Sequence, residues 1–192
     1  MKELLLLLIL PSVFFSQNAD IDLLHNINKN ASPGLDKSFQ FITQSVTPVS
    51  AGIPIGLFIA GCVSKNDVAK QNAYFIGASS ILTSMLSVSL KYTIKRDRPF
   101  VTYPFIAKKT KAGSPSFPSG HTSAAFATAT ALSVAYPKWY VIAPSFLWAS
   151  SVGYSRMYLG VHYPSDVIAG ALIGSGCSFI TWKGQQWLLK KK

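Results

Sequence analysis

The sequence predicts an all-α fold, an integral-membrane helical bundle with about five transmembrane helices. An N-terminal signal or anchor and a short interfacial helix are expected in addition. Of the 192 residues, 49% are hydrophobic and only 13% are charged, whereas soluble domains carry about 25% charged residues. Long uncharged segments alternate with short basic clusters. The net charge of +11 is therefore better explained by an anionic membrane surface than by nucleic acid.

Residues 1–19 resemble a signal peptide, and residues 20–192 are predicted to form one membrane domain. A basic start precedes an apolar run from Leu4 to Leu10, which is too short to span a bilayer. Cleavage is expected near Ser16 or Ala19. Bulky phenylalanines precede Ser16 and fit a cleavage site poorly, so an uncleaved anchor is the alternative.

The polar stretch that follows contains IDLLHNIN, the candidate interfacial helix, on which His25 is expected to face solvent or the membrane interface. After Lys37, uncharged segments bounded by charges are the candidate transmembrane helices. The segment 112–137 is neutral except for His121, and Pro48 is expected to kink or divide the segment 38–64. These segments are residues 38–64, 71–90, 112–137, 139–155 and 167–182.

The distribution of basic residues predicts which ends of these helices face outward. With the N-terminus outside, the inside loops contain Lys65, Lys70, Lys138 and the C-terminal lysines, as the positive-inside rule requires. The exception is the outside stretch 91–111, which has seven basic residues and one acid. Anion binding would explain this excess of positive charge.

The basic stretch begins with the first of three clusters whose residues could take part in a reaction, Lys91–Pro99. If the preceding helix continues to Pro99, then Lys91, Lys95 and Arg98 share one face. An ammonium group and a guanidinium group that converge suit a phosphate dianion. A basic patch for anionic lipid headgroups is an equally good interpretation of this cluster alone.

The second cluster is Pro118-Ser-Gly-His-Thr122. Ser119 is predicted to be the N-cap of the following helix, and Gly120 leaves the backbone open at its first turn. Free N–H groups there form an anion site. His121 lies in the same turn and could act as an acid or base, although a lone histidine at a helix start is usually structural.

The third cluster runs from Ser155-Arg156 to His162 and Asp166. Pro164 suits the first position of the last helix, which places Asp166 in its first turn. A carboxylate four residues after a histidine can hold one imidazole nitrogen and leave the other free to attack. The alternative is an acid that only stabilises the helix dipole.

The three motifs together resemble the signature of the type 2 phosphatidic acid phosphatase superfamily, the histidine phosphatases with a haloperoxidase-like core. K-x6-RP (Lys91–Pro99), PSGH (Pro118–His121) and SR-x5-H-x3-D (Ser155–Asp166) are complete and in family order, and they span residues 91–166.

The resemblance implies a metal-independent lipid phosphatase without a cofactor. His162 would be the nucleophile that forms a phosphohistidine, Asp166 would orient it, and His121 would protonate the leaving alcohol and then activate water. The residues that would hold the phosphoryl oxygens are Lys91, Arg98, Ser119, Gly120 and Arg156. The remaining basic residues are expected either to recruit an anionic headgroup or to stay solvated: Lys95, Arg96, Lys108, Lys109 and Lys111.

The expected substrate is a phosphate monoester or diphosphate of a membrane lipid: phosphatidic acid, phosphatidylglycerophosphate, undecaprenyl diphosphate or lipid A. No nucleic acid and no obligatory protein partner are implied. The expected location is the bacterial inner membrane, with the site facing the periplasm. The alternatives are a phosphotransferase with the same intermediate, a vanadium haloperoxidase-like enzyme, and a non-catalytic protein that binds anionic lipid. The motifs do not distinguish hydrolase from transferase or define the lipid.

Overall fold

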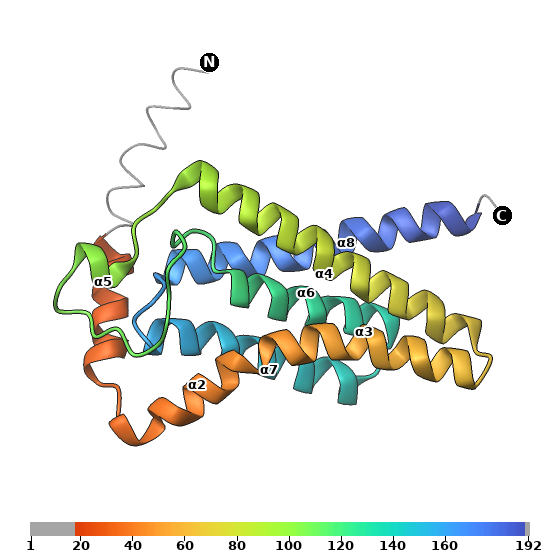
Figure 1. Cartoon of the computed structure of the whole chain (residues 1–192), viewed down its shortest axis with the longest axis horizontal. Coiled ribbons are helices and arrows are strands. Elements are labelled where there is room, and N and C mark those ends of the chain that lie inside the picture. The colour runs from red at the N-terminus through yellow and green to blue at the C-terminus, as the bar shows by residue number, and fades with distance from the viewer. Residues whose placement is uncertain (1–17, 191–192) are drawn as a thin grey trace, which may run out of the picture.

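The computed structural model describes residues 18–190, and over these residues it contains helices and no strands (Figure 1). The predicted all-α class is confirmed. Most of the predicted signal sequence, and with it the expected cleavage at Ser16, lies outside the described residues. After an N-terminal helix over residues 18–29, the elements are η1 (Pro33–Leu35), α2 (Asp36–Gln44), α3 (Val46–Val63), α4 (Asp67–Ile94), α5 (Pro99–Thr102), α6 (Gly120–Ala135), α7 (Trp139–Tyr158) and α8 (Pro164–Lys190).

Three helical stretches of the described chain are long and apolar enough to cross a membrane: Pro33–Val63, Asp67–Thr102 and Pro164–Lys190. They support the predicted membrane bundle. α6 and α7, which have 16 and 20 residues, are not among these three stretches. The number of about five transmembrane helices therefore stays a prediction.

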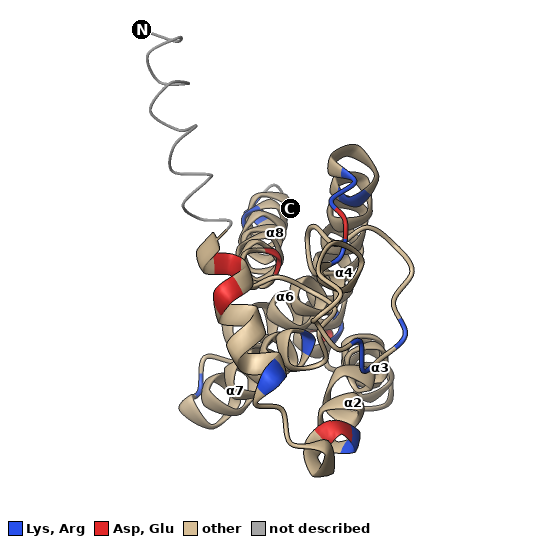
Figure 2. Cartoon of the chain, turned by 90° about the vertical axis from the view of Figure 1, so that its left-hand side faces the viewer, with Lys and Arg blue, Asp and Glu red and all other residues tan. Residues whose placement is uncertain are grey.

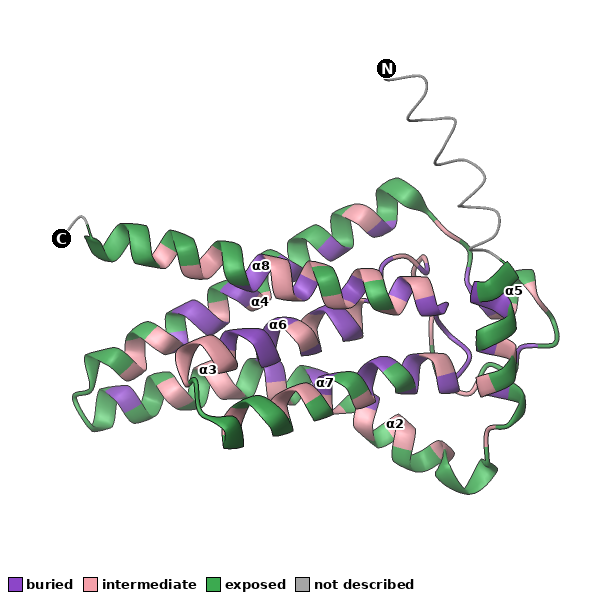
Figure 3. Cartoon of the chain, turned by 180° about the vertical axis from the view of Figure 1, so that it is seen from behind, coloured by how far each residue is buried: buried purple, intermediate pink, exposed green. Residues whose placement is uncertain are grey.

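α6 is the central helix, and α4, α7 and α8 pack around it. Figure 3 shows buried residues along α6 and exposed residues along the outer faces of α3, α4 and α8. The outer faces carry large apolar side chains such as Ile55, Ile81 and Leu172, each more than half exposed, as expected for contact with lipid tails. The middle of α6 is lined by small, fully buried residues: Ala125, Ala127, Ala129 and Ala131.

The small residues allow the backbones of α6 and α8 to approach closely. A Cβ atom on Gly174 would lie 2.2 Å from the carbonyl oxygen of Ser123, and one on Gly170 would lie 2.8 Å from that of Ser119. Both distances are shorter than real Cβ contacts, so glycine is required at these two positions of α8. The close approach brings the first turns of α6 and α8 together at one end of the bundle.

The end of α4 differs from the sequence prediction. The helix stops at Ile94, and its C-cap Lys95 adopts a left-handed conformation with φ of 53°. Arg98 is extended, as the residue before a proline usually is. The expectation that Lys91, Lys95 and Arg98 share one helical face is therefore wrong.

The N-terminal helix is packed against the site end of the bundle instead of lying on its surface. Ile21 and Leu24 are buried against Ile106 and Tyr163. His25 is half-buried, and its ring meets Phe105 edge-on at a centroid distance of 4.8 Å. The side chain is therefore partly shielded from solvent, and a position at the membrane interface, the other expectation for it, stays a prediction.

The amide of Asn28 fastens this helix to two distant segments. It accepts a hydrogen bond from the backbone N–H of Ala107 (2.8 Å) and donates to the carbonyl oxygens of Ala107 (3.0 Å) and Tyr158 (3.1 Å). Gly160, two residues after Tyr158, has φ of +69°, and a Cβ there would lie 2.3 Å from the carbonyl oxygen of Ala107. The N-terminal helix thereby fixes both the loop after α5 and the connection that leads to α8.

Candidate active site

The three sequence motifs meet at one end of the bundle (Figure 1). Viewed from that end, charged segments of the N-terminal helix, the end of α4 and the start of α8 gather around the helix ends (Figure 2). Lys91 comes from α4, His121 from the first turn of α6, Arg156 from the last turn of α7 and Asp166 from the first turn of α8. His162 lies in the connection between α7 and α8.

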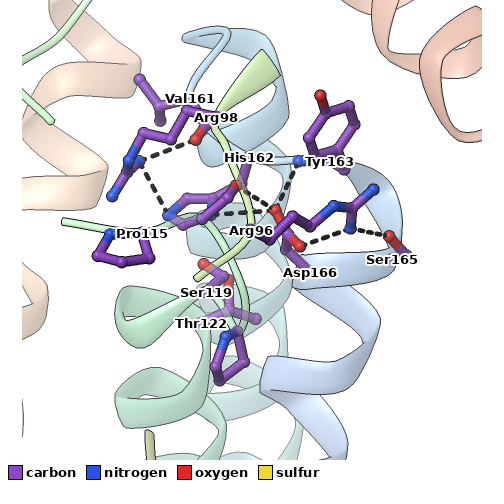
Figure 4. Close-up of polar contacts among 12 residues, drawn as sticks. Arg96, Arg98, Pro115, Ser119, Thr122, Val161, His162, Tyr163, Ser165 and Asp166 are labelled. Carbon is purple, nitrogen blue, oxygen red and sulfur yellow. Dashed lines mark hydrogen bonds and ion pairs between the residues drawn. The ribbon is translucent and has the colours of Figure 1, made fainter. Parts of the chain in front are cut away.

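His162 and Asp166 are held together by the start of α8. Pro164 opens the helix, so the Asp166 carboxylate turns back and accepts the Tyr163 N–H at 3.0 Å. The same oxygen, Oδ2, accepts the Ser116 hydroxyl at 2.5 Å and lies 3.4 Å from His162 Nδ1. This arrangement, drawn in Figure 4, favours a proton on Nδ1 and leaves the lone pair of the imidazole on Nε2.

The surroundings keep the His162 imidazole neutral. Burial lowers the pKa of His162 to about 3; Arg156 and Arg98 act in the same direction, while Asp166 opposes them. The ring is only 2% exposed. A neutral imidazole with one nitrogen held by a carboxylate is the form that can act as a nucleophile near neutral pH.

Arg98 is fixed beside the free nitrogen of His162. Its Nε donates to the carbonyl oxygen of Ser114 at 2.7 Å, and its Nη1 donates to that of Val161 at 2.8 Å. The same Nη1 lies 3.4 Å from His162 Nε2. Backbone carbonyls thus hold the guanidinium group without cancelling its charge.

Two more cations are buried in the same region. Lys91 Nζ donates to the carbonyl oxygens of Pro115 (2.8 Å) and Pro118 (2.7 Å). Arg156 is 3% exposed; its Nη1 donates to the Thr43 hydroxyl at 2.6 Å, and its Nε has no partner among the described residues.

Within residues 18–190, no carboxylate forms an ion pair with Lys91, Arg98 or Arg156. Buried charges without a counter-charge are costly. An anion bound between these cations would supply the counter-charge, and the unpartnered Nε of Arg156 offers it a further donor. The structure therefore brings three of the predicted phosphate-binding residues, Lys91, Arg98 and Arg156, into one cationic cluster next to His162, which we call the phosphate pocket.

The start of α6 holds the other two residues predicted to bind phosphate, Ser119 and Gly120. Ser119 is the N-cap, but its hydroxyl pairs with that of Thr122 at 2.8 Å instead of capping the helix. Its backbone N–H donates to the carbonyl oxygen of Asp166 at 3.0 Å, so this N–H joins α6 to α8 and is not free for an anion. Gly120, the first residue of α6, lies beside Lys91: a Cβ there would be 3.7 Å from Lys91 Cε. Its N–H belongs to the open first turn, as predicted.

His121 makes no side-chain hydrogen bond to any other described residue. Arg156, Arg98 and Lys91 are all close enough to act on it electrostatically. The position agrees with a group that would exchange protons with a bound phosphate ester.

The structure also adds residues that the sequence interpretation did not assign to the site. Ser116 bonds the Asp166 carboxylate, as described above, and Arg96 Nη1 donates to the other oxygen of that carboxylate at 2.7 Å. Arg96 Nη2 donates to Asp20 at 2.8 Å. Arg96 is thus neither a headgroup patch nor solvated, the two roles expected for it.

The other basic residues outside the motifs lie away from the pocket. Lys109 forms an ion pair with Asp36 at 2.8 Å, and Lys108 lies over the ring of Phe100 at 4.4 Å. Lys95 is exposed, as is Lys111. No group of three or more His, Cys, Asp or Glu side chains that could hold a metal occurs within residues 18–190.

A model of the PAP2 superfamily matches residues 72–190. Two relatives with an assigned activity are similar over part of this region. An undecaprenyl-diphosphatase from Sulfolobus acidocaldarius is 37% identical over 111 residues, which is 55% of this chain and 53% of that protein. A lipid A 4'-phosphatase from Bacteroides thetaiotaomicron is 36% identical over 78 residues, 41% of this chain and 35% of that protein. The chain thus spans about half, or less, of the length of these relatives.

Two solved structures share the fold over nearly their whole length. The crystal structure of Aquifex aeolicus LpxE has a TM-score of 0.72 at 32% identity, covering 86% of this chain and 95% of that one. A transmembrane PAP2 type phosphatidylglycerolphosphate phosphatase from Bacillus subtilis has a TM-score of 0.74 at 26% identity, covering 95% of this chain and 94% of that one.

Proposed function

The chain belongs to the PAP2 superfamily, as its motifs predicted, and from this premise we propose that it is a metal-independent lipid phosphatase. It would hydrolyse the phosphate monoester or diphosphate of a membrane lipid. The named activities of its relatives make undecaprenyl diphosphate, lipid A phosphates and phosphatidylglycerophosphate the first substrates to test.

The observation that carries this proposal is a neutral imidazole placed between a carboxylate and unpaired cations. His162 Nδ1 faces Asp166 at 3.4 Å, and its Nε2 faces Arg98 at 3.4 Å. A phosphoryl group bound by Lys91, Arg98 and Arg156 would present its phosphorus to Nε2. These cations would stabilise the charge of the transition state, a role for which fixed groups are effective.

The reaction would then proceed in two steps. In the first, Nε2 of His162 forms a bond to phosphorus as the bond to the lipid oxygen breaks. His121, which takes up a proton once the bound phosphoryl anion offsets the neighbouring cations, gives that proton to the lipid oxygen. In the second, His121 takes a proton from water, the water oxygen attacks phosphorus, and the N–P bond breaks to release phosphate. Gly120 would contribute the backbone N–H of the open helix start to the phosphoryl oxygens.

The placement of the site suits a substrate whose tails stay in the bilayer. The pocket lies at the end of helices whose outer faces are apolar and exposed. We propose that residues 20–192 form the phosphatase domain, with this end facing the periplasm. The basic loops at Lys65, Lys70 and Lys138 would then face the cytoplasm.

The test is phosphate release by detergent-purified protein in the presence of a strong chelator. Phosphatidic acid, phosphatidylglycerophosphate, undecaprenyl diphosphate and lipid A would be compared. His162→Ala should abolish release and His121→Ala should reduce it by more than about 100-fold. His25→Ala is the matched control, because the chain has three histidines and His25 lies outside the pocket; it should keep wild-type turnover.

A trapping experiment tests the intermediate directly. Brief reaction with substrate labelled in the phosphate, followed by alkaline quenching, should leave label on wild-type and His121→Ala protein and none on His162→Ala. Turnover by His162→Ala would refute the assignment of the nucleophile. Loss of activity in chelator that a divalent ion restores would refute the metal-independent mechanism, and label recovered on an added alcohol instead of in phosphate would indicate a phosphotransferase.

A further inference from the structure

Arg96 occupies a bridging position between two carboxylates. Its Nη1 donates to Asp166 Oδ1 at 2.7 Å and to the Ser165 hydroxyl at 2.7 Å, while its Nη2 donates to Asp20 Oδ2 at 2.8 Å. The guanidinium plane also stacks on Tyr163, with Cζ 3.9 Å from the ring centroid. Figure 4 shows the bonds from Arg96 to Ser165 and Asp166; together with the Asp20 bond and the Tyr163 ring, they leave Arg96 little freedom to move.

Asp20 anchors this arrangement from the N-terminal helix. Its carboxylate accepts the backbone N–H of Ser165 at 2.8 Å and also accepts the Ser165 hydroxyl. Ser165 is the second residue of α8, so Asp20 caps this helix from a segment 145 residues away. One carboxylate thus fixes both Arg96 and the helix start from which Asp166 projects.

The two oxygens of Asp166 have separate partners as a result. Oδ1 is bound by Arg96, while Oδ2 accepts from Ser116 and Tyr163 and faces His162. Asp166 is fully buried, so its orientation depends on these bonds. A carboxylate held at both oxygens cannot rotate away from the imidazole.

We infer that Arg96 and Asp20 are positioning residues that hold the Asp166 carboxylate, and through it the His162 ring, in the orientation needed for attack on the phosphoryl group. This inference rests on the proposed function. It assigns a catalytic effect to the N-terminal helix, which lies outside the three motifs.

Arg96 differs in this respect from the cations of the phosphate pocket. Lys91, Arg98 and Arg156 have no carboxylate partner in the described chain, whereas Arg96 has two. Its charge is already balanced, so it has little left to offer a substrate anion. Its removal should therefore affect the chemical step more than binding.

The test compares turnover of Arg96→Gln, Arg96→Lys, Asp20→Asn and the double variant with that of wild-type protein. Lys95→Gln is the matched control, because it removes the same charge from an exposed neighbour. Arg96→Gln should lower kcat about 10- to 100-fold, as small displacements of a reacting group do. KM and inhibition by inorganic phosphate should stay within about threefold of wild type, because the phosphate ligands are untouched.

The conservative and double variants separate positioning from general structural damage. Arg96→Lys, which keeps the charge but not the forked contacts, should recover part of the lost kcat. Asp20→Asn should lower kcat by less than Arg96→Gln does. In the double variant the loss should be smaller than the product of the two single losses, because Asp20 acts partly through Arg96 and partly through its bonds to Ser165. If Arg96→Gln does not fold, the kcat of Arg96→Lys and Asp20→Asn decides the same point.

Three results would overturn the inference. The first is a kcat for Arg96→Gln equal to that of Lys95→Gln. The second is an Arg96→Gln variant with wild-type kcat but a raised KM and weaker inhibition by phosphate. The third is a double variant whose loss of kcat equals the product of the losses in Asp20→Asn and Arg96→Gln. If wild-type protein turns over lipid phosphate, each of these leaves the proposed function standing. Absence of turnover by wild-type protein would overturn both.

Discussion

The close contact between α6 and α8 can be tested by adding a single methyl group. In Gly174→Ala, the new Cβ would lie 2.2 Å from the carbonyl oxygen of Ser123 and 2.8 Å from the backbone nitrogen of Ala127. Both neighbours belong to helix backbone and cannot rotate away. Gly176, two residues further along α8, has nothing within 4 Å of the same ideal position, so Gly176→Ala is the control.

The expected effects of the two substitutions have opposite signs. Replacing glycine by alanine inside a helix stabilises it by about 0.5–1 kcal/mol when there is room. At Gly174, α6 and α8 must first separate until the 2.2 Å contact reaches at least 3.0 Å, a shift of about 0.8 Å. Overpacking of this kind typically costs about 1–3 kcal/mol. Because the helix-propensity gain is common to both variants, the difference between them measures the steric cost.

The assay is thermal unfolding of the purified variants in one detergent, together with turnover. For a chain of this length, about 1 kcal/mol corresponds to about 2–4 °C in Tm, so Gly174→Ala should unfold about 2–12 °C below Gly176→Ala. Turnover should also fall, because the Ser119 N–H bond to Asp166 joins the same two helices at the site. Equal Tm values for the two variants would refute the close-packing explanation.

Two further predictions concern stability. Burial lowers the pKa of His162 from 6.5 to about 3, so on acidification the unfolded chain binds a proton at this residue before the folded chain does, and Tm should fall as the pH decreases from 6.5 toward 3. In His162→Ala, measured by the same thermal scan, the decrease in Tm should be smaller. The same pH dependence in both proteins would contradict the lowered pKa of His162. Asn28→Ala should lower the free energy of unfolding by about 1–3 kcal/mol, because it leaves the buried carbonyl of Tyr158 without its partner and removes two part-buried bonds to Ala107. The control is Asn26→Ala, at an exposed position of the same helix, and an equal Tm for the two variants would show that the amide contacts contribute little.

The arrangement of the site could be predicted from the sequence wherever a local signal marks a helix end. Pro164 followed by Asp166 predicted the first turn of α8, and the structure places the carboxylate beside His162 as expected. Alternating charged and apolar segments likewise predicted the order of the helices. Such signals are local, because proline, glycine and charge act on the nearest turn.

The parts that failed depend on contacts between distant residues. Arg96 differs from its basic neighbours through its bonds to Asp20, 76 residues earlier, and to Asp166, 70 residues later, and no periodicity predicts such contacts. The end of α4 at Ile94 depends on the left-handed backbone conformation of Lys95, which a lysine in the sequence does not predict. The bond from the Ser119 N–H to the carbonyl oxygen of Asp166 was not predicted either, because the close approach of α8 is a tertiary feature.

The long-range bonds around the N-terminal helix also determine when the site can form during synthesis. Asp20 bonds a residue 145 positions later, and Asn28 bonds one 130 positions later. A ribosome adds residues at about 5–20 per second, so about 7–29 seconds separate the two ends of the first bond. Until synthesis reaches the first turn of α8, the chain lacks the Asp166 carboxylate that orients His162. The reactive centre is therefore assembled last, when the other helices are already available to receive it.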